Sequence, residues 1–207
     1  MKVDVLNTTG GVVKSVDLPE TVFGVEPNDH AIYLAVKAYQ AAQRQGTHKS
    51  KERAEIAGST RKLKKQKGTG TARAGSIKSG VFRGGGRIFG PRPRTYNLKL
   101  NKKVARLARR SALSQRMASG NLKVVENFTF NEPKTKEYSA VMDGLKLADV
   151  KSLLIVGDYD QNVYLSSRNL QKSRVISVNE LSTYDVLAAN EILVSEGAIS
   201  KLTETLA

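Results

Sequence analysis

The chain has 207 residues, of which 34 are Lys or Arg and 19 are Asp or Glu, so its formal net charge is +15. The absence of Cys excludes disulfide frameworks and thiol nucleophiles, and the presence of only two His makes a metal site unfavourable. We therefore expect no cofactor. No stretch approaches the roughly 20 apolar residues of a membrane span, so we expect a soluble, intracellular protein with no membrane partner.

The N-terminal residues predict two strands and a helix. Residues 2–6 and 12–18 have strand patterns, and the linker between them, Asn-Thr-Thr-Gly-Gly, has the chemistry of a hairpin turn. A helix is predicted to begin at Asn28 or Asp29 as the capping residue, and Gly46 is a plausible stop.

The charge of the chain is strongly segregated. Residues 44–123 contain 23 basic residues and two acidic ones, Glu52 and Glu55, a formal charge of +21. The remaining residues contain 11 basic and 17 acidic side chains, a formal charge of −6. The sequence therefore predicts a mildly acidic globule with a strongly basic insertion, and a polyanionic partner would meet the insertion.

The insertion, residues 46–97, has little from which to build a core. It contains ten Gly and eight large apolar residues, which follow neither helical spacing nor strict alternation. Ordering the backbone costs roughly 1–2 kcal/mol per residue, and glycine costs more than average. We therefore expect one globular domain from residues 1–45 and 98–207, with residues 46–97 as a long extended basic loop that projects from it and is ordered by a partner.

Residues 101–118 are predicted to form a helix with an apolar and a basic side. At 100° per residue, Val104 and Leu107 share the apolar arc. Leu113 and Met117 fall on the opposite side, so the amphipathic pattern is imperfect. The basic residues of that side are Lys102, Arg106, Arg109, Arg110 and Arg116.

The rest of the chain alternates between strand and helix patterns. Residues 153–156, Leu-Leu-Ile-Val, are apolar throughout, as expected for a central parallel strand covered on both faces. The alternation predicts an α/β fold, a three-layer sandwich with a mostly parallel central sheet. The predicted strands are residues 123–127, 152–157, 174–178 and 191–195. The predicted helices are residues 134–145, 161–170, 182–189 and 198–206.

Basic, glycine and aromatic residues are interleaved along the insertion. Arginine forks two hydrogen bonds to a phosphate, glycine lets the backbone approach closely, and the rings of Phe82, Phe89 and Tyr96 offer faces on which unpaired bases can stack. Because no DNA-binding motif is evident, the combination predicts binding to folded RNA. The residues predicted to bind RNA are Arg44, Lys49, Lys51, Arg53, Arg61, Lys62, Lys64, Lys65, Lys67, Arg73, Lys78, Arg83, Arg87, Arg92, Arg94, Lys102, Arg106 and Arg109.

Six short motifs follow one another along the chain in a distinctive order. They are Arg44-Gln45-Gly46-Thr47, Arg53-Ala54-Glu55, Gln66-Lys67-Gly68-Thr69-Gly70, Ala72-Arg73-Ala74-Gly75-Ser76, Asn101-Lys102-Lys103 and Pro133-Lys134-Thr135-Lys136. In this order they resemble the bacterial large-subunit ribosomal protein four family. The resemblance covers nearly the full chain and is most specific in the segment from Gln66 to Arg73.

The resemblance implies a structural protein of the large ribosomal subunit that binds 23S rRNA, supports assembly, and has neither catalytic activity nor a small-molecule substrate. It also implies that the loop threads the rRNA and lines the narrow part of the peptide exit tunnel. Its partners would be neighbouring large-subunit proteins, above all the loop of ribosomal protein twenty-two. The tunnel-lining residues would be Gln66, Lys67, Gly68, Thr69, Gly70 and Thr71.

Three other interpretations stay open at this point. A regulator that binds DNA or another RNA would use the same basic loop. An α/β enzyme would use Asp158 and Asp160, which follow a predicted central strand, although a polar strand-to-helix turn is the favoured explanation of this pair. A cationic membrane-surface protein is disfavoured because the basic segment lacks a sustained apolar face.

Overall fold

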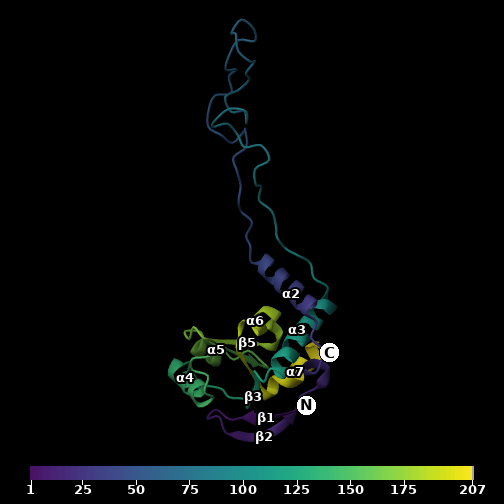
Figure 1. Ribbon diagram of the computed structural model, residues 1–207. Coiled ribbons are helices and arrows are strands. Elements are labelled where there is room, and N and C mark those ends of the chain that lie inside the picture. The colour runs from purple at the N-terminus through teal and green to yellow at the C-terminus, as the bar shows by residue number, and fades with distance from the viewer. Residues whose placement is uncertain (207) are drawn as a thin grey trace. The chain divides into compact units, whose positions relative to one another are not determined.

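In the computed structural model, which describes residues 1–206, the strands form one sheet of order β2-β1-β3-β6-β4-β5 (Figure 1). β1 (Lys2–Leu6) and β2 (Val12–Asp17) pair antiparallel, and all the other neighbouring strands pair parallel. The mostly parallel sheet confirms the predicted α/β class. The remaining strands are β3 (Leu122–Val125), β4 (Ser152–Val156), β5 (Ser173–Ser177) and β6 (Glu191–Ser195).

The hairpin between β1 and β2 has the predicted turn. Asn7 N donates to Gly11 O at 2.8 Å, and Gly10 N donates to Asn7 O at 3.1 Å. Gly10 adopts φ +85°, a left-handed conformation that favours glycine. The antiparallel hairpin therefore extends one edge of the parallel sheet.

Helices cover both faces of the sheet, which gives the three layers of the predicted sandwich (Figure 1). One face is covered by α1 (Glu20–Phe23), α3 (Lys102–Ala118), α6 (Thr183–Ala188) and α7 (Glu196–Leu206), together with Ile32 of α2 (Asp29–Ala42). The other face is covered by α4 (Thr135–Gly144) and α5 (Gln161–Ser167). A short 3-10 helix, η1 (Val178–Glu180), follows β5.

The apolar side chains of β4 pack into the hydrophobic cores on both faces of the sheet. Leu153 and Ile155 belong to the cluster under α3 and α7, whereas Leu154 belongs to the cluster under α4 and α5. Alternate side chains of a strand point to opposite faces, so a strand buried on both sides is apolar at every position. This confirms the interpretation of residues 153–156.

The helical-wheel interpretation of α3 was wrong at Leu113 and Met117. Leu113 is fully buried, and Met117 packs against the same cluster. The physical reason is that α3 packs against three helices, α1, α6 and α7, so its buried surface is wider than one amphipathic stripe. α1, a single turn whose Val22 and Phe23 are buried, was not predicted.

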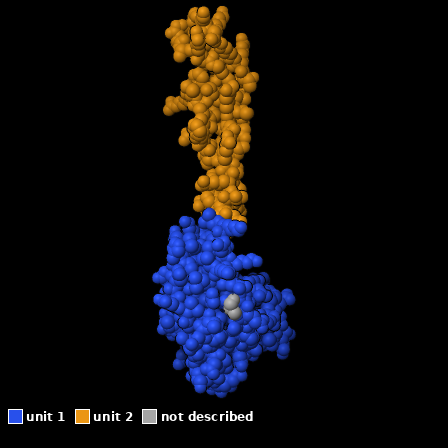
Figure 2. All heavy atoms as spheres, turned by 90° about the vertical axis from the view of Figure 1, so that its right-hand side faces the viewer, with its two compact units in different colours: residues 1–40, 98–207 blue, residues 41–97 orange. Residues whose placement is uncertain are grey.

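Residues 41–97 form a second compact unit, unit 2, distinct from unit 1, which combines residues 1–40 with the chain from residue 98 onward (Figure 2). All residues from 43 to 101 are described, and they contain no helix or strand, only an isolated antiparallel bridge between Lys62 and Ser76. Across the described chain, no helix combines the length and apolar character needed to cross a membrane.

Candidate RNA-binding interface

Backbone hydrogen bonds hold the two ends of unit 2 side by side. Arg94 N donates to Gly46 O at 3.1 Å, and Ser50 N donates to Pro91 O at 3.0 Å. Gly46 adopts φ +65°, and a Cβ at this position would lie 2.0 Å from Arg94 O. Glycine is therefore required for this approach. We call these paired segments, residues 44–50 and 91–96, the neck.

The ring of Tyr96 also holds the neck together. The Cζ atoms of Arg44 and Arg94 lie 4.0 Å and 4.7 Å from its ring centroid, and the ring centroid of His48 lies 6.1 Å away. Guanidinium groups over an aromatic face are attracted by the ring quadrupole. Tyr96, which the sequence analysis interpreted as a face for base stacking, is therefore covered by cations of its own chain. Arg94, two residues before Tyr96 in the sequence, was the signal that could have indicated this role.

The middle of unit 2 is packed through glycine backbones. A Cβ on Gly86 would lie 2.4 Å from Arg53 N, and a Cβ on Gly85 would lie 1.9 Å from Ser79 O. Among the described apolar side chains of the unit, Ala74 is buried, so side-chain burial contributes little. Close backbone contacts thus replace the apolar core that the segment lacks.

Both acidic side chains of unit 2 are paired within it. Glu52 Oε1 lies 2.7 Å from Arg92 Nη2, and Lys49 Nζ contacts Glu55 Oε1. The hydrogen bond from Lys49 lowers the pKa of Glu55, and the backbone N–H of Glu52 lowers this pKa further. Two of the predicted RNA-binding residues, Lys49 and Arg92, are therefore engaged by acids of the same unit.

The far end of the unit is a closed loop. The bridge between Lys62 and Ser76 and the hydrogen bond from Leu63 N to Gly75 O, 2.9 Å, join its two sides. Lys64 Nζ also donates to Thr71 Oγ1 at 2.7 Å. We call the six residues from Gln66 to Thr71 the tip, and all of them are exposed.

Two glycines of the tip have a left-handed backbone in open space. Gly68 adopts φ +80° and Gly70 adopts φ +62°, with no neighbouring atom within 4 Å of a Cβ built on either. The chain reverses here because these residues have no Cβ penalty at positive φ. The predicted tunnel-lining residues are thus brought together at one exposed turn.

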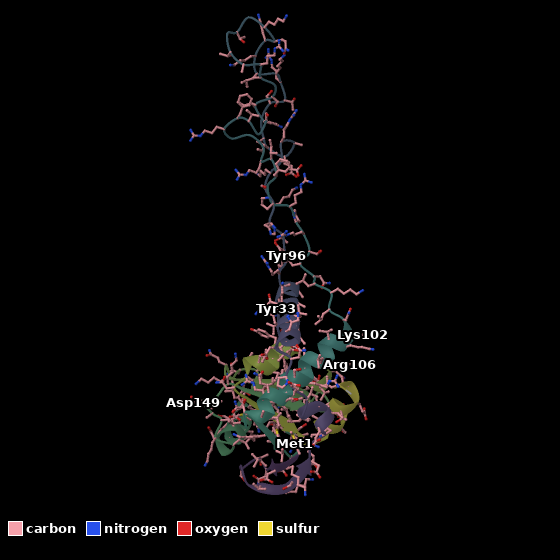
Figure 3. The ribbon with its side chains drawn as sticks, turned by 45° about the vertical axis from the view of Figure 1, so that its right-hand side comes forward. Met1, Tyr33, Tyr96, Lys102, Arg106 and Asp149 are labelled. Atoms are coloured by element: carbon pink, nitrogen blue, oxygen red, sulfur yellow. The ribbon has the colours of Figure 1, made fainter. Side chains whose placement is uncertain are left out.

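Fifteen of the predicted RNA-binding residues, from Arg44 to Arg94, lie in unit 2. Apart from Lys78, which is half-buried, all of them are exposed. With the two acids, they give residues 41–97 a formal charge of +13. Their nitrogen atoms are visible along the length of the unit (Figure 3). The described surface of unit 2 is thus cationic and has few competing acids.

The other three predicted residues lie on α3 in unit 1. Lys102, Arg106 and Arg109 are spaced by four and three residues, so they follow one side of the helix, where Figure 3 labels the first two. Partial burial lowers the pKa of Arg109, and the charge of Arg106 lowers it further, but an arginine stays protonated. Arg116 has a different role, since its Nη2 donates to Leu187 O at 2.9 Å and so stabilises the fold.

The first turn of α3 has an unusual charge for a helix N-terminus. It contains basic residues and no acidic ones, and the capping residue Asn101 makes no side-chain hydrogen bond to the helix. Cations are disfavoured near a helix N-terminus by a few tenths of a kcal/mol or more. An external anion would offset this cost, which makes the basic side of α3 a suitable phosphate-facing surface.

The acidic pair after β4 forms a turn. Asp160 caps α5, because its Oδ1 accepts hydrogen bonds from Asn162 N at 2.8 Å and Val163 N at 3.3 Å. Asp158 is exposed and contacts Lys201 Nζ. The two carboxylates therefore have separate structural partners, which agrees with the favoured interpretation of a polar strand-to-helix turn.

The structure also gives no support to an active site next to this turn. An open groove of about 1020 Å³ runs beside β5 and includes Tyr159, but neither Asp158 nor Asp160 lines it. The buried acid in this groove, Asp185, is paired with Arg174 at 2.6 Å. Within residues 1–206, no three or more His, Cys, Asp or Glu side chains are grouped so as to hold a metal ion.

Comparison with known proteins agrees with this geometry. The Ribosomal protein L4/L1 family matches residues 16–205. The large ribosomal subunit protein uL4 of Cytophaga hutchinsonii is 56% identical over 207 residues, covering 100% of both chains. The protein of the same name from Amoebophilus asiaticus is 58% identical over 205 residues, covering 99% of this chain and 98% of its own. The chain described here therefore belongs to the ribosomal protein L4/L1 family.

Proposed function

We propose that this chain is a structural protein of the large ribosomal subunit in which residues 46–97 form an rRNA-penetrating loop and residues 1–45 and 98–207 form the globular domain. Membership of the family makes the chain a non-enzymatic component of the subunit that binds rRNA and other ribosomal proteins. In bacteria this subunit is cytoplasmic. The alternatives, a nucleic-acid-binding regulator and an α/β enzyme, are not favoured.

The observation that carries the proposal is the exposed charge of unit 2. Its residues have a formal charge of +13, and both of its acids are ion-paired within the unit. Each phosphate that such a surface neutralises releases counterions, which supplies affinity without any reading of base sequence. The basic residues of unit 2 and of α3 are accordingly the proposed rRNA contacts.

The tip has the properties required of a tunnel wall. Its six residues are exposed, and Gly68 and Gly70 form the turn with positive φ angles. In this proposal Gln66, Lys67, Gly68, Thr69, Gly70 and Thr71 line the narrow part of the peptide exit tunnel. The loop of ribosomal protein twenty-two faces them there, and the cationic sides of unit 2 contact the surrounding rRNA.

Two variants test this division of labour. Large subunits are assembled with the full chain, with a chain lacking residues 58–94, or with a chain lacking only the tip, and are then sedimented through a high-salt wash. We expect the full chain and the chain without the tip to stay bound, and the chain lacking residues 58–94 to be washed off. If that chain stayed bound as firmly as the full one, the loop would not be the main rRNA contact.

A further inference from the structure

Phe89 has an unusual environment for a large apolar residue. Its relative exposure is 104%, so its ring contacts almost nothing in the structure. It also adopts φ +53°, and Lys146 is the other non-glycine residue with positive φ in the described chain. A left-handed backbone and a fully hydrated aromatic ring are both unfavourable. Residues with such an unfavourable conformation are typically found at sites that bind a ligand.

The backbone on both sides of Phe89 is held in place. Arg87 N donates to Lys51 O at 3.0 Å. On the other side, a Cβ on Gly90 would lie 1.8 Å from Ser50 Oγ and 2.8 Å from Arg87 Cγ, so the chain is tightly packed there. The exposed ring of Phe89 therefore belongs to a segment whose backbone is fixed on both sides. The aliphatic part of the Arg87 side chain lies close to Gly90, the residue after Phe89.

The other two aromatic side chains singled out in the insertion have different surroundings. The ring of Tyr96 lies under the guanidinium groups of Arg44 and Arg94. Phe82 is half-buried, and its backbone closes a turn in which Phe82 N donates to Ser79 O at 3.0 Å. Of the three, Phe89 is thus the one with a free ring face.

We propose that Phe89 is a stacking platform for one unpaired nucleobase of the large-subunit rRNA, with the exposed guanidinium of Arg87 bound to a neighbouring phosphate. This inference rests on the proposed function, because it takes rRNA as the partner of unit 2. Every nucleobase has a π-face that can stack on an aromatic ring, so the contact needs no particular base. The formal charge of +13 on residues 41–97 favours a polyanion over a protein as the partner that covers this ring.

The absence of Trp from the chain provides a direct probe. In the full-length Phe89→Trp variant, position 89 carries the only indole, and in a Phe82→Trp control the half-buried position carries it. Both are titrated with purified large-subunit rRNA while indole emission is followed. Stacking on a base quenches the indole, so we expect strong quenching at position 89 and much weaker quenching at position 82.

Affinity measurements with further variants separate stacking from other contacts. Phe89→Tyr keeps an aromatic face and should bind rRNA like the unaltered chain. Phe89→Leu stays apolar but has no π-face, and Phe89→Gly allows the positive φ while removing the ring, so both should bind about tenfold more weakly. Arg87→Ala should lower the slope of log affinity against log salt by about the value for one phosphate contact. Phe89→Leu should leave this slope unchanged.

The possible outcomes distinguish this inference from the proposed function. If the unaltered chain binds rRNA but the indole at position 89 is unquenched and Phe89→Leu binds normally, the stacking platform is wrong and the proposed function stands. If quenching requires other large-subunit proteins rather than rRNA, Phe89 is a protein contact and the inference is likewise overturned. If the unaltered chain does not bind rRNA, both fail. Because Phe89 is fully exposed, the variants should fold normally, which circular dichroism checks.

Discussion

The guanidinium carbon of Arg44 lies 4.0 Å from the ring centroid of Tyr96, and that of Arg94, on the opposite segment of the neck, lies 4.7 Å from it. One aromatic ring thus joins the segments that enter and leave unit 2. Exposed cation–π contacts contribute about 0.5–1 kcal/mol each, which is enough to shift the opening of a short paired segment.

Replacing Tyr96 should therefore loosen the neck. In the Tyr96→Leu variant we expect the N–H of Arg94, which is bonded to Gly46 O, to exchange with solvent about five- to tenfold faster, because both cation–π contacts are lost. Tyr96→Phe keeps the ring and should exchange at the original rate. Hydrogen exchange followed by mass spectrometry measures both, and equal rates in the two variants would show that the ring contributes nothing.

Glycine at position 46 should be essential for the same pairing. In Gly46→Ala the new Cβ would collide with Arg94 O at 2.0 Å, and the φ of +65° would be strained. Gly75→Ala is a matched control, since a Cβ there meets nothing within 4 Å. We expect Gly46→Ala to raise protease cleavage in the neck severalfold while Gly75→Ala leaves it unchanged. Similar cleavage of both variants would contradict the close approach.

Arginines of unit 2 that form a salt bridge within the unit should contribute less to rRNA binding than arginines that form none. Arg92 lies 2.7 Å from Glu52, whereas no carboxylate of the described chain forms a salt bridge with Arg83. Arg83→Ala should therefore lower the slope of log affinity against log salt by about 0.9, the value for one phosphate. Arg92→Ala should change this slope much less. Filter binding from moderate to high salt gives both slopes, and equal decreases would mean that the ion pair opens on RNA.

Tyr138 should make the stability of the globular domain fall at alkaline pH. Its side chain is fully buried, and its hydroxyl lies 2.7 Å from Ser173 Oγ. Burial raises the pKa of Tyr138 to about 12, and the hydrogen bond to Ser173 opposes this rise. Because the unfolded chain ionises this group near pH 10, its contribution to stability is intact below pH 10 and is lost progressively between pH 10 and 12.

Urea unfolding of the unaltered chain and of Tyr138→Phe isolates this effect from the other titrating groups. Between pH 9 and 11, we expect the unaltered chain to lose about 1 kcal/mol more free energy of unfolding than the variant does. Parallel pH profiles would mean that Tyr138 ionises as easily in the folded state as in the unfolded one.

The fold of unit 1 could be predicted because its patterns are local. The apolar run at residues 153–156 indicates a buried strand, and the structure has β4 there. The turn residues between β1 and β2 indicate a hairpin, which the structure also has. Leu113 could not be placed, because its burial depends on three helices packing around α3. A helical wheel describes one helix, and it has no information on how many neighbours that helix has.

The composition of the candidate interface could be predicted, but its internal architecture could not. Residue counts of charge and glycine alone were enough to predict a basic loop at residues 46–97. The pairing of Gly46 with Arg94 and the packing of Gly86 against Arg53 arise from backbone approach between residues far apart in the chain, which leaves no periodic signal. Phe82, Phe89 and Tyr96 were all predicted to stack on bases, and in the structure the full exposure of Phe89 and the two guanidinium groups over Tyr96 distinguish them.

In our proposal, residues 46–97 bind large-subunit rRNA through exposed basic side chains and bring the tip to the exit tunnel. A density map of the large subunit that contains this chain is the decisive test. We expect residues 46–97 to be surrounded by rRNA, with arginine and lysine side chains at phosphates and Lys67 at the tunnel wall. Density that placed residues 46–97 in solvent, or mainly against other proteins, would contradict it.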